Sequence, residues 1–170
     1  MTNDRTKLPY RKNCEGYFLF RDDSIVAQDT GKGYVEFPGG GIDEGESPKN
    51  AILREAAEET GAMVKNLKFV EKINFDWDEN WAKTEKQKGR YKQYRGEEMH
   101  LFIGKVSKFV NADGDLKNND PALKGRKFME IKEVIEKIQE LKPFPQNMTG
   151  YYAKQLYYLR NISRLLMCEA

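Results

Sequence analysis

The amino-acid sequence predicts an α+β fold, a layered sandwich in which helices cover a mixed β-sheet. Segments with strand-like alternation and segments with helical spacing both occur, without the regular strand–helix–strand order of a parallel sheet. No internal repeat and no linker rich in Ser, Gly or Pro divides the 170 residues. We therefore expect one domain over residues 1–170, with a core at about 12–142 and a C-terminal helix at about 148–167.

The first half of the chain contains short strands and then one helix. "CEGYFLF" is rich in aromatic residues, as strands are, and a polar "RDD" separates it from a shorter strand, "SIVAQ". "DTGKG" turns the chain into "YVEF", which ends at a proline and three glycines. The helix that follows has clear terminal signals: Ser47 can cap the free amides, Pro48 takes the first helical position, and Gly61 supplies a left-handed stop.

The second half contains two longer strands and two helices. "LKFVEKINF" and "EEMHLFIGKV" alternate like strands, and a long polar segment at residues 76–96 separates them. "FMEIKEVIEKIQEL" is typical of a short strand followed by an amphipathic helix. The final "YYAKQLYYLRNISRLL" has aromatic residues and leucines at helical spacing. We expect this aromatic stripe to pack in the core or in a dimer contact.

Composition and cysteine usage exclude several classes of protein. Charged residues make up 33% of the chain, which indicates a globular protein, and the net charge of +2 gives no overall attraction to nucleic acid or membrane. No run of 18 apolar residues and no signal-peptide segment occurs, so we expect a cytoplasmic protein without membrane association. Cys14 and Cys168 lack CxxC spacing, which argues against zinc or a disulfide framework. We expect His100, alone in an alternating strand, to be structural.

Three acids crowd the end of the predicted helix, in "REAAEETG". At about 100° per residue, Glu55, Glu58 and Glu59 fall within an arc of about 100° on one face. Like charges at this spacing cost about 0.2–0.5 kcal/mol per pair, and the negative end of the helix dipole adds about 0.3–1 kcal/mol per anion. A divalent cation reverses the sign of both effects, and carboxylate oxygens are what Mg²⁺ selects. We therefore expect a metal site, with a solvated acidic face as the alternative.

The residues around these acids match a longer pattern. From Gly40 the chain reads "GIDEGESPKNAILREAAEETGAM", in which five residues separate Gly40 from Glu46 and seven separate Glu46 from Arg54. This stretch resembles the signature of the Nudix hydrolases at every defined position, with Ala56 and Met63 at its two apolar sites. The preceding "YVEFPGG" is similar to the usual sequence before that signature. The resemblance implies a Nudix fold, an α/β/α sandwich with a central mixed β-sheet.

The resemblance also implies ligands for Mg²⁺, with Mn²⁺ as a possible substitute. They are Glu55, Glu58, Glu59 and the backbone carbonyl of Gly39, which would hold the cation against a substrate diphosphate.

The same resemblance gives supporting roles to the loop before the helix. Glu46 and Arg54 match an ion pair that ties the loop to the helix, and Arg54 is placed to orient a neighbouring glutamate. Gly40 belongs to a run of glycines that lets the backbone approach phosphate or metal closely.

The general base differs between Nudix subfamilies, so several residues remain candidates. Glu55 and Glu58 are the candidates within the signature. Glu98, or its neighbour Glu97, is the candidate outside it, just ahead of the strand "MHLFIG". The alternative for both is a charged strand end.

A basic segment follows the first long strand. "KTEKQKGRYKQYR", at residues 83–95, carries six cations and one acid, and aromatic residues are interleaved. Beside an acidic metal site it predicts substrate binding, with Lys83, Arg90 and Arg95 on phosphate and Tyr91 on a base. The alternative is a mobile, solvated loop.

These observations predict Mg²⁺-dependent hydrolysis of a phosphoanhydride bond in a nucleoside diphosphate linked to another group. Candidate substrates are nucleoside di- and triphosphates, dinucleoside polyphosphates and nucleotide sugars. The alternatives are an RNA 5′-end pyrophosphohydrolase, which the basic segment favours, and a nucleotide-sensing Nudix module without activity, which typically lacks these acids. An isomerase would need a nucleophile near the signature, and Cys14 lies far from it in sequence. A homodimer remains compatible with the sequence.

Overall fold

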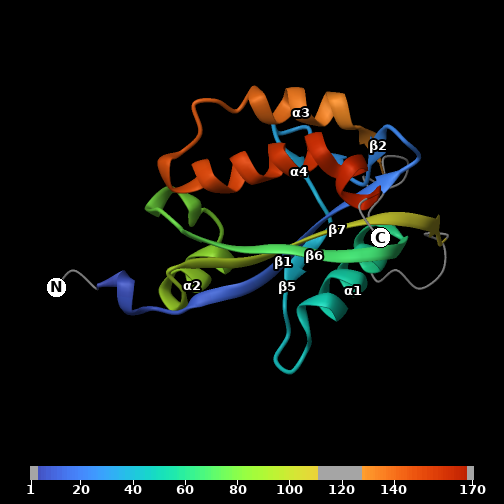
Figure 1. Ribbon diagram of the computed structural model, residues 1–170. Helices are drawn as coiled ribbons and strands as arrows, with labels where there is room; N and C mark the ends of the chain where they lie inside the picture. Colours follow the sequence, from blue (N-terminus) through green and yellow to red (C-terminus); the bar gives the residue numbers. More distant parts are fainter. Residues whose placement is uncertain (1–3, 111–127, 168–170) are drawn as a thin grey trace.

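A computed structural model of the chain describes residues 4–110 and 128–167. A mixed β-sheet forms the middle layer (Figure 1). Helices α3 (Ile131–Gln139) and α4 (Thr149–Met167) lie on one side of the sheet, and α1 (Pro48–Thr60) lies on the other. This arrangement confirms the predicted α+β sandwich.

Three long strands build the centre of the sheet. β1 (Tyr10–Phe20) pairs in parallel with β7 (Gly96–Phe109), and β7 pairs antiparallel with β6 (Ala62–Asp76). The remaining strands are short: β2 (Ser24–Ile25), β5 (Gly39–Gly41), β8 (Met129–Glu130), and the separate hairpin of β3 (Gln28–Asp29) and β4 (Val35–Glu36). Single 3₁₀ turns occur at Arg5–Lys7, Glu79–Trp81 and Gln146–Met148.

Alternate residues of the central strands fill two separate cores, because successive side chains of a strand point to opposite faces. Tyr17 and Leu101 belong to the core beneath α3 and α4. Phe18 and Phe102 belong to the core beneath α1, where the small, fully buried side chain of Ala56 faces them. The small residue lets the helix approach the sheet closely.

The ends of α1 agree with the signals in the sequence. The Ser47 hydroxyl accepts a hydrogen bond from the Asn50 amide at 3.1 Å, and Pro48 is the first helical residue. Gly61 adopts φ 72°, a left-handed conformation, and its N–H bonds the Ala57 carbonyl. The helix therefore begins and ends where the sequence predicted.

The polar segment between β6 and β7 contains a helix, α2 (Glu85–Gln93). Thr84 and Gln87 cap it reciprocally, each side chain accepting a hydrogen bond from the other's backbone amide. Tyr91 packs against the core beneath α4. The alternative of a solvated loop is therefore wrong, and the Thr-x-x-Gln pattern was the signal for the helix.

Within the described ranges, none of the helices is long and apolar enough to cross a membrane.

Candidate functional site

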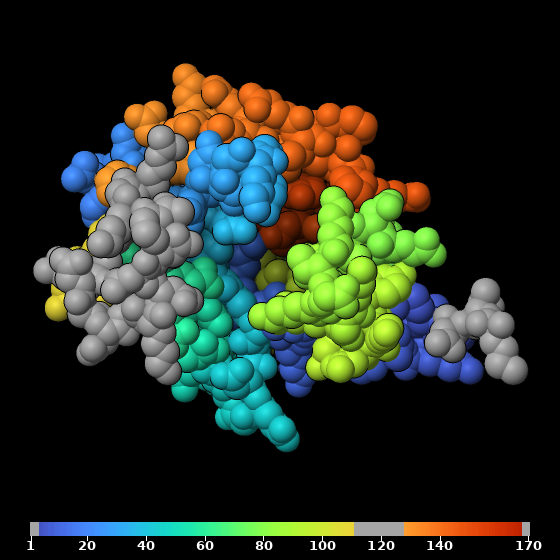
Figure 2. Space-filling model, turned by 180° about the vertical axis from the view of Figure 1, so that it is seen from behind, coloured from blue at the N-terminus to red at the C-terminus, as the bar shows by residue number. Residues whose placement is uncertain are grey.

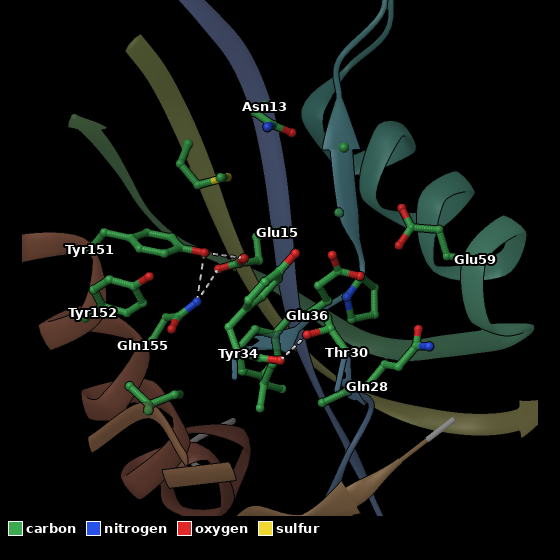
Figure 3. Close-up of a pocket in the computed structure, with 18 of the residues that line it drawn as sticks. Asn13, Glu15, Gln28, Thr30, Tyr34, Glu36, Glu59, Tyr151, Tyr152 and Gln155 are labelled. Atoms are coloured by element: carbon green, nitrogen blue, oxygen red, sulfur yellow. Dashed lines mark hydrogen bonds between the residues drawn. The ribbon is translucent and has the colours of Figure 1, made fainter. Parts of the chain in front are cut away.

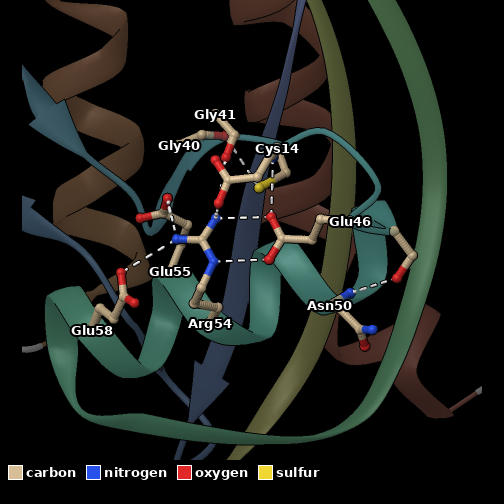
Figure 4. A network of polar contacts seen from close by, with 10 residues as sticks. Cys14, Gly40, Gly41, Glu46, Asn50, Arg54, Glu55 and Glu58 are labelled. Carbon is tan, nitrogen blue, oxygen red and sulfur yellow. Dashed lines mark hydrogen bonds and ion pairs between the residues drawn. The ribbon is translucent and has the colours of Figure 1, made fainter.

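Arg54 connects α1 to the loop that precedes it (Figure 4). Its Nε and Nη2 donate to the two carboxylate oxygens of Glu46, each at 2.9 Å, and Nη2 also reaches the Gly41 carbonyl at 3.3 Å. The bidentate pair lowers the pKa of Glu46 to about 2, chiefly through the hydrogen bonds from Arg54. The glycine loop is therefore fixed relative to the helix.

The same guanidinium also orients two acids of α1. Nη1 of Arg54 lies 3.0 Å from Glu55 Oε1 and 3.3 Å from Glu58 Oε2. The Glu58 side chain is 60% exposed, whereas that of Glu55 is 15% exposed. Glu58 thus stands at the outer rim of the site and Glu55 inside it.

Glu55 and Glu59 form a close carboxyl pair beside the glycine loop. Burial raises the pKa of Glu59, and so do its hydrogen bond to Glu55 and the charge of that neighbour. A Cβ added at Gly40 would lie 2.5 Å from Glu55 Oε1, so a larger residue at this position would push the Glu55 carboxylate aside. Burial and the neighbouring charge therefore favour a protonated Glu59 in the absence of a metal cation.

These residues fit a divalent cation. A buried carboxyl pair and a nearby backbone are oxygen donors of the kind that Mg²⁺ takes, and a metal ion would displace the proton of Glu59. Among the described residues no three acidic, His or Cys side chains converge into an assembled metal cluster. Arg54 donates to both Glu55 and Glu58. Glu58 would therefore have to leave Arg54 to join Glu55 and Glu59 at a bound cation.

A pocket of about 730 Å³ opens beside these acids (Figure 3). Glu59 and the glycines of β5 form one wall. Tyr34 from the β3–β4 hairpin and Tyr151 and Tyr152 from α4 form the opposite side. The expected core packing of the α4 aromatic stripe is confirmed, because Tyr158 is buried in the core and Tyr151 and Tyr152 pack against it. The sequence did not indicate that Tyr151 and Tyr152 also line the pocket.

The pocket floor contains a buried acid that the sequence did not single out. Glu15 accepts hydrogen bonds from the hydroxyls of Tyr17 and Tyr151, both at 2.5 Å, and from Gln155 Nε2 at 3.3 Å. Burial raises the pKa of Glu15, and the three donors partly offset this effect. The network connects the central strand to α4 at the pocket.

The predicted substrate-binding residues of the basic segment lie outside this pocket. Arg95 pairs with Asp76 at 2.9 Å, and the Arg5 guanidinium lies 3.4 Å from the ring centre of Tyr91. Lys83 is exposed just before α2, and Arg90 is half-buried within it. Tyr91 and Arg95 thus make internal contacts, while Lys83 and Arg90 remain accessible.

The two candidate bases ahead of "MHLFIG" have different surroundings. Glu98 pairs with Lys72 and with His100, both at 3.2 Å. Glu97 accepts a hydrogen bond at 3.0 Å from Asn13, which lines the pocket, and burial raises the pKa of Glu97. Glu97 is therefore connected to the pocket wall, whereas the contacts of Glu98 are with β6 and β7.

Cys14 lies against the signature in space although it is far from it in sequence. Its thiol donates to the Gly40 carbonyl at 3.3 Å, because β1 pairs with β5. Burial raises the pKa of this thiol to about 12, so it is protonated at neutral pH and is a poor nucleophile. Cys168 falls outside the described residues.

Comparison with known proteins gives consistent results. The NUDIX domain model matches residues 11–152. An RNA pyrophosphohydrolase of a Nitratiruptor species is 31% identical over 126 residues, 72% of this chain and 76% of that protein. An RNA pyrophosphohydrolase of Helicobacter pylori is 26% identical over 88% of both chains. The solved structure of a NUDIX hydrolase from Nitrosomonas europaea shares the fold, with a TM-score of 0.55 at 18% identity over 91% of this chain and 90% of that one.

Proposed function

The chain belongs to the NUDIX family and is a pyrophosphohydrolase, and from this premise we propose that it removes pyrophosphate from the triphosphorylated 5′ end of RNA, using Mg²⁺. The observation that carries the proposal is a pocket beside the acids of α1, together with the open hollow that Figure 2 shows between α1 and α2. A 5′ end can enter the pocket while the rest of a strand leaves along the surface. Relatives that cover most of this chain are named RNA pyrophosphohydrolases.

The acids of α1 have distinct proposed roles. Glu55, Glu58, Glu59 and the Gly39 carbonyl would hold the cation, which when bound neutralises phosphate oxygens and makes the attacking water more acidic. Arg54 keeps Glu55 oriented and, through Glu46, keeps the glycine loop in place.

The proposed reaction breaks one phosphoanhydride bond. The water oxygen forms a bond to phosphorus, the P–O bond between the α- and β-phosphoryl groups breaks, and the products are monophosphorylated RNA and pyrophosphate. A carboxylate takes the proton of the water. We propose Glu55 or Glu58 for this role, with Glu98 and Glu97 as the candidates outside α1.

The pocket itself favours a second candidate function. Its volume of about 730 Å³ is within the range of small-molecule sites, and three tyrosines line it. Hydrolysis of nucleoside di- or triphosphates, dinucleoside polyphosphates or nucleotide sugars therefore remains the alternative to RNA.

One substrate panel separates the two functions. The protein with Mg²⁺ is given a triphosphorylated RNA of ten nucleotides, nucleoside triphosphates, a dinucleoside polyphosphate and a nucleotide sugar, and the phosphate products are quantified. We expect kcat/KM for RNA to exceed that for each small nucleotide by at least about ten-fold. Higher kcat/KM for a small nucleotide would overturn the RNA proposal. ¹⁸O-labelled water identifies which phosphorus is attacked.

A further inference from the structure

Two arginines share one buried acid at the edge of the pocket. Arg11 Nη1 lies 3.8 Å from Glu97 Oε1, while Glu97 already accepts a hydrogen bond from Asn13. A Cβ added at Gly41 would lie 2.4 Å from Arg11 Nη2, so the guanidinium packs directly on the glycine loop before α1. Arg11 also borders a second hollow, of about 480 Å³, which that loop lines as well.

Arg90 brings a second guanidinium close to the first. It lies in the last turn of α2, is half-buried, and interacts electrostatically with both Arg11 and Glu97. Burial and the charge of Arg11 lower the pKa of Arg90. Among the described residues, the Arg90 guanidinium forms no hydrogen bond or ion pair. Of the three side chains Arg11, Arg90 and Glu97, two are cationic and one is acidic, and this excess of positive charge suits an anionic ligand.

The positive charge continues outward along one face of α2. Lys86 precedes Arg90 by four residues, about 40° away around the helix, and Lys83 lies just before the first turn. Both lysines are exposed. Lys88 is on another face, where it pairs with Glu85 at 3.2 Å. We call Lys83, Lys86, Arg90 and Arg11 the basic track, which runs from the exposed start of α2 to the neighbouring Arg90 and Arg11.

The helix that carries most of the basic track lies across the hollow from the helix that carries the acids (Figure 2). Figure 2 shows α2, in yellow-green, as one wall of the hollow, and the cyan-to-teal segment of β5 and α1 on the other side. A strand whose 5′ end reaches the acidic wall can therefore leave along the basic wall. RNA carries one phosphate per nucleotide, and spaced cations match that repeat.

We propose that the basic track binds the phosphodiester backbone of the RNA strand that follows the 5′ end. This inference rests on the proposed function and identifies the part of the substrate that distinguishes RNA from a small nucleotide. Lysines at the rim contact phosphates beyond the second nucleotide, which a dinucleotide does not have.

The test compares two double variants with the same change in charge. Lys83→Gln with Lys86→Gln removes the exposed half of the track, and Lys88→Gln with Lys92→Gln is the matched control on the other side of α2. Initial rates are measured on a triphosphorylated ten-nucleotide RNA and on a triphosphorylated dinucleotide. For the track variant, we expect KM for the ten-nucleotide RNA to rise about ten-fold and KM for the dinucleotide to change less than about two-fold.

Binding of a ten-nucleotide RNA with a 5′-hydroxyl, followed by fluorescence anisotropy, tests the track separately from hydrolysis. The slope of log affinity against log salt should become shallower by about 1.4 in the track variant, because two phosphate contacts are lost. The inference would be overturned if the control variant lost as much affinity for this RNA as the track variant, or if the track variant bound it like the wild-type protein. If the track variant loses affinity for this RNA while the wild-type protein hydrolyses only small nucleotides, the track stands and the proposed function fails.

Discussion

Two charged helices lie on opposite sides of the hollow, and they place their charges in opposite relation to the helix dipole. α1 has Glu58 and Glu59 near its C-terminal end and no basic residue in its last turn. α2 has Glu85 in its first turn and Arg90 and Lys92 in its last. Since a helix C-terminus is negative, the acids of α1 are disfavoured there and the cations of α2 are favoured.

This difference shows which charges carry information about function. A charge that the helix dipole and its neighbours stabilise can occur in any solvated helix. A charge that they destabilise needs a compensating partner. By this criterion the acids of α1 are the strong sign of a ligand. In α2 the dipole favours Arg90 too, but burial and the neighbouring charge of Arg11 oppose it, so Arg90 is the cation of this helix that meets the criterion.

The largest expected effect is the loss of one acid of α1. Glu58→Gln should lower kcat on triphosphorylated RNA by about 1,000-fold or more, equivalent to about 4 kcal/mol, because a proposed ligand and base is removed. The melting temperature should stay close to that of the wild-type protein, since Glu58 is at the exposed rim. If the variant kept its activity with Mg²⁺, Glu58 would be neither a metal ligand nor the base. The charge of Glu58 would then not be a sign of function.

A smaller effect is expected on stability at Glu59. Burial and Glu55 raise the pKa of Glu59, so its favourable contribution to folding is present at low pH and is lost as the pH rises from about 4.5 through its folded value. Without metal, Glu59→Gln should therefore melt above the wild-type protein at pH 8, and the difference should disappear near pH 4.

Mg²⁺ should reverse this order in the same experiment. At a concentration about 100 times its Kd, a bound ligand adds about 2.7 kcal/mol of stability, and calorimetric melting would register this for the wild-type protein. Glu59→Gln should gain little from the metal. An equal gain in both proteins would place the cation elsewhere.

The smallest effect is expected on the other helix. Lys92→Gln removes a cation that the dipole of α2 favours, so the free energy of unfolding in urea should fall by less than about 1 kcal/mol. Turnover of RNA should be unchanged, because Lys92 is outside the basic track. A large loss of activity would show that cations of α2 outside the basic track also contribute to turnover of RNA.

The sequence predicted the features that depend on neighbouring residues. Ser47, Pro48 and Gly61 determine the ends of α1 through local backbone chemistry, so this helix could be predicted closely. The strands around it could be predicted from alternation, although β6 and β7 extend further than their most regular segments. Local spacing also brings Glu55, Glu58 and Glu59 to one helix, and their roles as metal ligands stay a prediction.

The features that the sequence did not predict depend on contacts between distant segments. Tyr151 enters the pocket because α4 packs over β1, where Glu15 accepts its hydrogen bond, and helical spacing alone does not select that face. Cys14 reaches Gly40 through strand pairing across 26 residues. Alternation places Glu97 and Glu98 on opposite faces of β7 but does not say which face carries the pocket.

The hydrogen bonds from Tyr151 and Gln155 to Glu15 hold the last helix of the described chain against the pocket. The proposed catalytic acids come from α1, whereas Tyr151, Tyr152 and Gln155 of the last helix line the pocket that would select the substrate. Redesigning that helix offers a route to altered selectivity that leaves the hydrolytic machinery untouched.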